Sequence, residues 1–306
     1  YEVCISDNFS EEKILPVIDK YNQKINIILN RNESNIGLGA NILKSVSLAS
    51  GDYAWILGND DIVLPESFNY LEKLFEISKD VDFFYINSYH IKKQDIEKYH
   101  HPLNPNQLNL LNLKKFSKYN KSGKLNFFEL IHPRKSFEFM LSMYLCIFRL
   151  KDWKENIDVV DKKKIMDKTL YSNFDNTAPH IKIWSKAFNK KKAYFLHKPL
   201  TANVHGPRGD DWGDLYPFVE AVRIPQVLDC YRKNGMSYLR YFICKNFALR
   251  RFLPSYFNML TNSKIRGLEF VDFKRDILKN LFYPGIYLFG FYFFLRRLIM
   301  IAKKLF

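Results

Sequence analysis

Apolar residues at the start of the chain follow two alternating patterns. Short apolar runs rich in β-branched and aromatic residues are typical of buried strands, and they occur at residues 1–6, 25–29, 53–57 and 81–86. Between these runs, apolar residues recur at helical spacing over 37–50 and 66–79, and a further helix is expected after residue 10. Strands that alternate with helices predict the α/β class, with a Rossmann-like, mixed and mostly parallel sheet that has helices on both faces.

The helix expected after residue 10 has recognisable start signals. Ser10 offers a capping hydroxyl, and the acids Glu11 and Glu12 favour the amino end of a helix. Pro16 fits a helix only in its first turn, so this helix should begin close to Pro16. Gly51 marks the end of the helix over 37–50.

The regular alternation stops after residue 88, so we divide the chain into four parts. Residues 1–88 form the first half of the α/β domain, and the polar residues 89–135 are predicted to be an insertion or a mobile lid. Apolar runs resume near Phe137, and residues 136–214 are expected to complete the domain. Residues 215–306 are expected to be a helical region with many basic and aromatic side chains.

An apolar block lies close to the end of the chain, from Leu281 to Leu295, and is followed by Arg296 and Arg297. It is short for a transmembrane helix, which needs about 20 apolar residues. An amphipathic helix that lies in the membrane surface fits the block better, with its cations on lipid phosphates. A helical hairpin buried in the core is the alternative interpretation.

Charge and composition narrow the choice of partner. The chain has 47 Lys and Arg against 32 Asp and Glu, a formal net charge of +15, which favours an anionic partner such as an acidic membrane, a phosphorylated substrate or nucleic acid. The 27 Phe and 19 Tyr suit contact with lipid or with sugar rings. The four scattered cysteines predict no zinc site or disulfide framework, and they favour a reducing compartment. The sequence opens in a strand-like run without a signal-peptide pattern, so we expect it to begin inside a domain.

Acidic residues follow two of the predicted strands. Asp7 comes after the first strand, and Asn59, Asp60 and Asp61 come after the third. In open α/β sheets, ligands bind beyond the carboxyl ends of parallel strands, so these side chains should share one edge. Adjacent carboxylates suit Mg²⁺ or Mn²⁺, which keep positions open for substrate phosphates. An ordinary strand-to-helix turn is the alternative explanation of the sequence GNDD.

The segments SDNFSEE and RNESNIGLGANILKSVSLASGDYAWILGNDD resemble the nucleotide-binding half of the family-2 glycosyltransferases with the GT-A fold. They are most similar to the abequosyltransferase-like bacterial branch, whose members build surface polysaccharides. The resemblance covers residues 1–88 well and residues 137–205 more loosely. It implies that 1–88 is the nucleotide-sugar-binding half, without the family's first strand, and that 136–214 is the acceptor-side half.

The resemblance implies roles for the residues that match the family's motifs. Asp60 would hold Mn²⁺ or Mg²⁺ as the second acid of the D-x-D motif, with Asp61 beside it; the first position of that motif is Gly58 here, not Asp. Asp7 would contact the nucleotide base. The remaining residues expected to line the nucleotide and the sugar are Arg31, Asn35, Gly37 and Asn59.

Inverting sugar transfer requires a base that takes the proton of the acceptor hydroxyl. The family supplies an acid at the start of a helix in the second half, where this chain has Pro179-His180, so we rank His180 first and Asp175 second. Structural packing is the alternative role for His180. The family often places a late histidine near the metal or the diphosphate, and His205 stands there, with Arg208 in the following loop expected to meet phosphate. An incidental surface loop is the alternative for both.

The sequence therefore predicts an inverting, metal-dependent glycosyltransferase that moves a sugar from a nucleotide-sugar donor to a hydroxyl of a lipid-linked or surface polysaccharide. The basic, aromatic carboxyl-terminal region predicts a cytoplasmic, peripheral protein on the inner face of the plasma membrane, whereas nucleic acid is not expected as a partner. Two other classes stay open: a sugar-phosphate nucleotidyltransferase, and a non-catalytic basic protein that binds a membrane surface.

Overall fold

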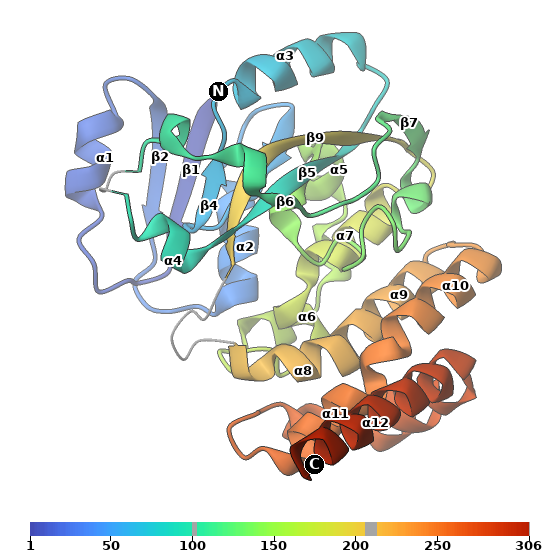
Figure 1. Ribbon diagram of the computed structural model, residues 1–306. Coiled ribbons are helices and arrows are strands. Elements are labelled where there is room, and N and C mark those ends of the chain that lie inside the picture. The colour runs from blue at the N-terminus through green and yellow to red at the C-terminus, as the bar shows by residue number, and fades with distance from the viewer. Residues whose placement is uncertain (100–102, 206–212, 306) are drawn as a thin grey trace.

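A small parallel sheet forms the amino-terminal part of the fold in the computed structural model, which describes residues 1–99, 103–205 and 213–305. Strands β1 (Glu2–Asp7) and β2 (Asn26–Arg31) pair in parallel, with Asp7 opposite Arg31. Helices α1 (Leu15–Tyr21) and α2 (Leu38–Ser47) connect and flank them (Figure 1). The predicted alternation of strand and helix is confirmed here.

A seven-stranded sheet forms the centre of the molecule, in the order β3-β8-β5-β9-β4 with β6 and β7 as side branches. The long strands β5 and β9 run parallel, and the other pairs in this sheet are antiparallel among the described residues. The bounds of the strands are β3 (Tyr53–Trp55), β4 (Asp61–Val63), β5 (Phe83–Lys92), β6 (Lys114–Lys115), β7 (Gly123–Asn126), β8 (Cys146–Arg149) and β9 (Lys192–His205).

The mixed α/β architecture is as predicted, but the pairing is more antiparallel than the sequence indicated. The strand β4 has three residues inside what looked like a strand-to-helix turn, and it folds back against β9. The strand β8 enters between β3 and β5 from the opposite direction. The local sequence pattern of β4 and β8 does not reveal these pairings, because the strands that they pair with lie far away in the sequence.

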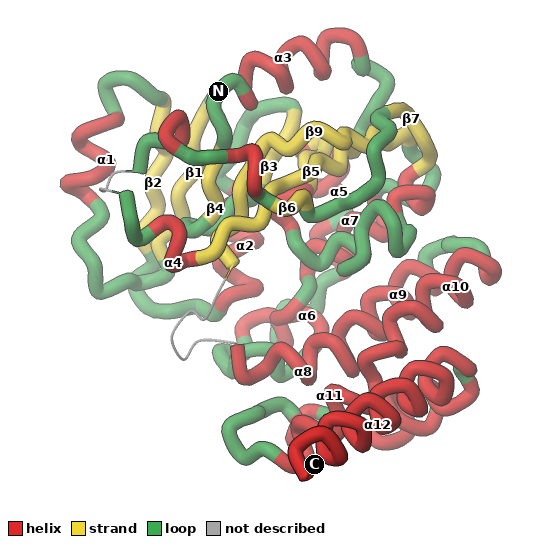
Figure 2. Tube along the Cα trace, in the orientation of Figure 1, coloured by secondary structure: helices red, strands yellow, loops and turns green. Residues whose placement is uncertain are grey.

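Helices cover the sheet and build a separate layer below it (Figure 2). The helices near the sheet are α3 (Ser67–Ile77), α4 (Lys93–Ile96), α5 (Leu150–Glu155), α6 (Phe174–Thr177) and α7 (Pro179–Ala187). The lower layer contains α8 (Tyr216–Phe218), α9 (Ile224–Lys233), α10 (Tyr238–Ala248), α11 (Phe252–Thr261) and α12 (Pro284–Leu305). The predicted helical carboxyl-terminal region is therefore present. Among the described residues, no helix combines the length and apolarity needed to cross a bilayer.

Two local expectations differ from the structure. The helix α1 begins at Leu15 with Pro16 in its first turn, as expected, but Ser10 is not its cap; the Ser10 amide instead donates to Asp7 Oδ1. Part of the segment 89–135 is ordered, because it contributes the strands β6 and β7 and buries Phe116 and Phe127. Burial of a few aromatic side chains is thus enough to order part of this segment, although its overall composition is polar.

The main core lies between the central sheet and the helices α2, α7 and α9. Phe83 on β5 meets the rings of Phe127, Trp184 and Phe188 at centroid distances of 5.0 to 5.3 Å. The same cluster includes Val227 and other buried residues of α9 and α10. Because apolar burial is the largest favourable term in folding, this shared core fixes the helical layer against the edge of the sheet.

Candidate functional site

Some of the predicted site residues lie at one edge of the molecule. The carboxyl ends of β1, β2 and β9 and the amino end of β4 lie along the edge that faces the helical layer (Figure 1). Asp61 at the start of β4 stands opposite Asn203 near the end of β9, and Asp7 stands opposite Arg31. We call this edge the acidic rim, defined by Asp7, Asp60 and Asp61.

Asp7 is a buried carboxylate that stays ionised. Hydrogen bonding from the Ser10 amide, 3.0 Å from Asp7 Oδ1, lowers its pKa, and the nearby Arg31 charge acts in the same direction. Arg31 Nε lies 3.4 Å from Asp7 Oδ2, and the guanidinium also donates to the Ser10 carbonyl at 2.9 Å. Asp7 and Arg31, each expected to contact the nucleotide, therefore pair with each other at the ends of two neighbouring strands.

A cluster of amide side chains connects the end of β1 to the start of α2. Asn35 Oδ1 accepts hydrogen bonds from the Gly37 amide at 2.8 Å and from Asn8 Nδ2 at 2.9 Å. Asn8 Oδ1 in turn accepts from the Ile36 amide at 2.9 Å. The role of Asn8 was missed in the sequence, although it is the last residue of the SDN motif that carried the resemblance.

The glycines at the start of α2 are explained by a close approach of the chain to itself. A Cβ at Gly37, whose φ is +89°, would lie 3.2 Å from the Asp167 carbonyl oxygen. A Cβ at Gly39 would lie 2.9 Å from the Asn176 Cα. The segment around residues 165–176 therefore packs directly against the start of α2, which leaves no room for a larger side chain at Gly39.

The turn from Gly58 to Asp61 contributes two carboxylates, those of Asp60 and Asp61, to the acidic rim. The Gly58 amide donates to Asp61 Oδ2 at 2.7 Å, and Asn203 Nδ2 donates to Asp61 Oδ1 at 2.9 Å. A Cβ at Gly58 would lie only 2.5 Å from Asp60 Oδ1, so a glycine here allows Asp60 to fold back over the turn. The exposed Asn59 lies at the tip of the turn.

The donor set of this turn fits a divalent cation. Carboxylate oxygens are the preferred ligands of Mg²⁺ and Mn²⁺, and Asp60 and Asp61 supply them side by side. Burial raises the pKa of Asp61, and the hydrogen bonds from Asn203 and the Gly58 amide act in the opposite direction. Over residues 1–99, 103–205 and 213–305, no three His, Cys, Asp or Glu side chains form a ready metal site. The strand β9 ends at His205, while Arg208 lies outside the described residues.

His180, the first choice as base, lies in the core. Its side chain is 1% exposed, its Nε2 lies 3.0 Å from the Leu141 carbonyl oxygen, and its ring packs edge-on against Trp184. Burial lowers the pKa of His180 to about 4, so the ring is neutral near pH 7. His180 therefore has the contacts of a structural core residue, and it does not lie at the acidic rim.

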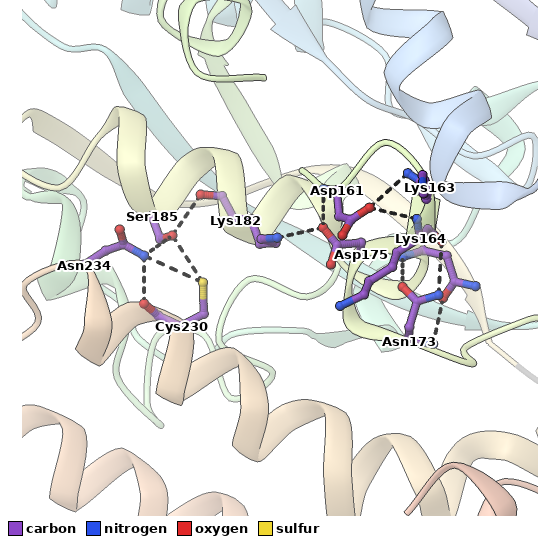
Figure 3. A network of polar contacts seen from close by, with 10 residues as sticks. Asp161, Lys163, Lys164, Asn173, Asp175, Lys182, Ser185, Cys230 and Asn234 are labelled. Atoms are coloured by element: carbon purple, nitrogen blue, oxygen red, sulfur yellow. Dashed lines mark hydrogen bonds and ion pairs between the residues drawn. The ribbon is translucent and has the colours of Figure 1, made fainter. Parts of the chain in front are cut away.

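Asp175, the second choice, belongs to a structural network (Figure 3). Its Oδ1 accepts a hydrogen bond from the Asp161 amide at 2.8 Å and an ion pair from Lys182 at 2.7 Å, and the residue is buried. These contacts connect the segment before α6 to α7. Both contacts hold the Asp175 carboxylate within the protein, so this arrangement favours a structural role.

Glu138 is an acid that the sequence analysis did not select. It lies in the segment that leads into β8, and β8 runs antiparallel to β3, so this segment begins at the edge where β3 ends. Burial raises the pKa of Glu138 to about 7. The sequence does mark Glu138, since it is a single acid inside the apolar stretch SFEFML. A partly buried carboxyl group is unusual without a function, so this position could have been chosen as a candidate.

Comparisons with known proteins show which proteins this chain resembles. Residues 1–145 match the model of the family described as "Glycosyl transferase family 2". The chain is 42% identical over 82 residues to abequosyltransferase RfbV of Salmonella typhimurium, covering 26% of this chain and 25% of that protein. It is 37% identical over 84 residues to the uncharacterized glycosyltransferase MJ1057 of Methanocaldococcus jannaschii, covering 27% and 29%. These alignments span only about a quarter of the relatives' length.

Solved structures extend the similarity over most of the chain. The crystal structure of S. aureus TarS 1-349 in complex with UDP aligns with a TM-score of 0.53, at 16% identity, over 88% of this chain and 67% of that one. The complex of the same protein with UDP-GlcNAc gives a TM-score of 0.55 over 88% and 68%. At this identity the similarity shows the fold, which is GT-A-like with a helical carboxyl-terminal region.

Proposed function

Because residues 1–145 match glycosyl transferase family 2, we propose that the chain transfers a sugar from a nucleotide-sugar donor to a hydroxyl of a lipid-linked or surface polysaccharide, with inversion. The observation that best supports this proposal is the acidic rim, where the Asp7–Arg31 pair and the Asp60–Asp61 turn share one edge of the fold. A sheet edge of this kind is where α/β folds bind nucleotides.

The Asp7 end of the rim suits the nucleoside. Asp7 Oδ2 is buried and accepts no hydrogen bond from the described residues, although Arg31 Nε lies 3.4 Å away. The lowered pKa keeps Asp7 ionised near neutral pH, and an ionised carboxylate forms stronger hydrogen bonds with N–H and O–H groups than a neutral one. Asn35 and Gly37, which stand at the start of α2, are proposed to line the same part of the donor, together with the exposed Asn59.

The Asp60–Asp61 end of the rim suits the diphosphate. We propose that Asp60 and Asp61 hold Mn²⁺ or Mg²⁺, with His205 as a further ligand and Arg208 on a phosphate. When bound, such an ion would compensate the negative charge that develops on the departing diphosphate. Asn203 and the Gly58 amide keep the Asp61 carboxylate oriented toward this position.

The carboxyl-terminal helix α12 suits a lipid-linked acceptor. Its exposed apolar side chains include Leu288 and Phe291, and Arg296 and Arg297 follow on the same helix. Exposed apolar surface of this extent on a single helix is characteristic of an interaction site, and the net charge of +15 favours an anionic surface. We therefore propose that the protein lies on the inner face of the plasma membrane, where it would meet its acceptor.

Product analysis tests the proposed reaction. The full chain is incubated with single nucleotide sugars, Mn²⁺ and membranes that carry lipid-linked glycans, and the release of nucleoside diphosphate is measured. The proposal predicts release that depends on the membranes, and a product whose anomeric configuration is opposite to that of the donor. Release of inorganic pyrophosphate from a sugar phosphate and a nucleoside triphosphate would instead indicate a nucleotidyltransferase.

A further inference from the structure

Glu138 stands where the rim meets the helical layer. The segment 138–145 precedes β8, and the Trp55 indole at the end of β3 donates to the Tyr144 carbonyl oxygen at 2.7 Å. Burial, then the charge of Glu138 and then that of Asp61 raise the pKa of Tyr144. The phenol of Tyr144 therefore lies within electrostatic range of both acids, so Glu138 and the turn from Gly58 to Asp61 lie near the same ring.

The backbone around Glu138 is held in an unusual conformation. Phe139 and Met140 have φ angles of +54° and +67°, in the left-handed region that residues with a side chain rarely adopt. Two core side chains hold this strained segment. The Tyr231 hydroxyl donates to the Phe139 carbonyl oxygen at 2.9 Å, and the His180 ring binds the Leu141 carbonyl oxygen at 3.0 Å. Strain of this kind persists where the surrounding structure fixes it, and it is common at functional sites.

The carboxylate of Glu138 has neutral polar neighbours. The Ser142 hydroxyl donates to Glu138 Oε2, and the phenols of Tyr85, Tyr144 and Tyr216 lie within range of its charge. Tyr216 belongs to α8 and Tyr85 to β5, so groups from both the sheet and the helical layer surround it. Within the described part of the chain, no Lys or Arg forms an ion pair with Glu138. A structural acid in this position would normally have such a partner.

We propose that Glu138 is the base of the transfer reaction, an inference that rests on the proposed function. The acceptor O–H bond breaks and its proton moves to a Glu138 carboxylate oxygen. The hydroxyl oxygen forms a bond to the anomeric carbon, and the bond from that carbon to the diphosphate oxygen breaks. Its electron pair leaves with the nucleoside diphosphate, so the step is balanced without a further reactant.

The chemistry of Glu138 suits this role better than that of the two candidates chosen from the sequence. A pKa of about 7 leaves a large ionised fraction near neutral pH and makes the carboxylate a stronger base than an ordinary Glu. His180 is occupied by the Leu141 carbonyl, and Asp175 is paired with Lys182. His180 therefore contributes by holding the segment that carries Glu138.

The Glu138→Gln variant of the full chain tests the proposal. We expect kcat to fall by about 10²- to 10⁴-fold, the usual contribution of a general base, with donor affinity within about twofold of the wild type. Azide attacks without losing a proton, so azide should restore turnover in this variant with a glycosyl azide as product. Retained kcat, or lost kcat that azide does not restore while the donor still binds, would overturn the assignment of Glu138.

A second variant keeps the carboxylate and changes only its pKa. Because the Ser142 hydrogen bond stabilises the ionised form, Ser142→Ala should move the rising limb of the pH–kcat profile to higher pH. Glu129→Gln is the matched control, since Glu129 caps the start of a short helix by accepting from the Asn126 amide, and its profile should not move. An unshifted Ser142→Ala profile would contradict the inference. A wild type that transfers no sugar would overturn the proposed function itself.

Discussion

Asn203 Nδ2 donates a hydrogen bond to Asp61 Oδ1 at 2.9 Å, and this contact joins residues that are 142 positions apart. It connects the turn after β3 to the end of β9, because Asp61 and Asn203 are also partners in the β4–β9 pairing. The Asp61 carboxylate is thereby oriented before any ligand arrives. The geometry of the acidic rim consequently depends on the second half of the chain as well as on the first.

Removing this hydrogen bond should destabilise the fold. In Asn203→Ala, the partly buried Asp61 carboxylate loses a donor, and an unsatisfied group of this kind costs about 1–3 kcal/mol. Chemical denaturation would measure the change in the free energy of unfolding. Asn59→Ala, at an exposed position of the same turn, is the control and should change it by less than about 0.5 kcal/mol. Equal effects of the two substitutions would contradict a structural role for the Asp61–Asn203 bond.

Gly58 should matter for ligand binding more than for stability. A Cβ at this position would meet Asp60 Oδ1 at 2.5 Å, and the carboxylate can swing away because it is the end of a flexible side chain. Gly58→Ala should therefore unfold at nearly the same temperature while its affinity for Mn²⁺ and nucleotide sugar falls about tenfold, or about 1.4 kcal/mol. Gly123→Ala, where a Cβ would meet nothing within 4 Å, should leave both quantities unchanged.

His180 should make the protein sensitive to acid. Its pKa is about 4 in the folded chain against an ordinary value of 6.5, so the unfolded chain binds more protons between these values. Stability supplied by the neutral ring is complete above pH 6.5 and is lost as the pH falls through 4, by an amount on the order of 3 kcal/mol. Denaturation at pH 7.5 and pH 5 would measure the part that is lost above pH 5, about 2 kcal/mol. His180→Gln, which lacks the titrating ring, should show a smaller difference between the two pH values than the wild type; an identical difference would exclude this origin.

The apolar face of α12 should determine membrane binding. Leu288 and Phe291 are 70% and 73% exposed and lie three residues apart, so they share one face of the helix. Substituting both with Glu should weaken binding to vesicles of anionic phospholipid at least about tenfold, because burial of each such side chain contributes about 1.5–3 kcal/mol. Ile77→Glu is the control, at a 75% exposed position on α3 at the opposite end of the molecule (Figure 1). Co-sedimentation that is equal for both variants would argue against an α12 anchor.

Much of the fold followed from local patterns in the sequence. Most strands and helices of residues 1–88 follow from short apolar runs and from helical spacing, whereas α1, which has no buried residue, follows from Pro16 and the acids before it. The antiparallel insertion of β8 and the three-residue strand β4 were not recognised. Both depend on partners that are distant in the sequence, such as Asn203 for Asp61, and a distant partner leaves no local pattern.

The site was predictable where it follows strand ends. Asp7, Asp60 and Asp61 follow predicted strands, which is why the sequence points to them; in the structure Asp7 ends β1 of the small sheet, whereas Asp61 begins β4 of the central sheet. His180 was selected by residue type, but its depth in the core is set by tertiary packing against Trp184. Glu138 was overlooked because its surroundings come from β5, α8 and the segment before β8.

The central claim is that the acidic rim holds a metal ion together with a nucleotide-sugar donor. Isothermal titration of the wild type and of Asp60→Asn with a panel of nucleotide sugars, each with and without Mn²⁺, tests it most directly. We predict that Mn²⁺ raises the affinity of the wild type for one donor at least about tenfold and that Asp60→Asn, folded to the same extent, loses this increase. Equal affinities of the two proteins in Mn²⁺, or binding by the wild type that ignores the metal, would contradict the claim.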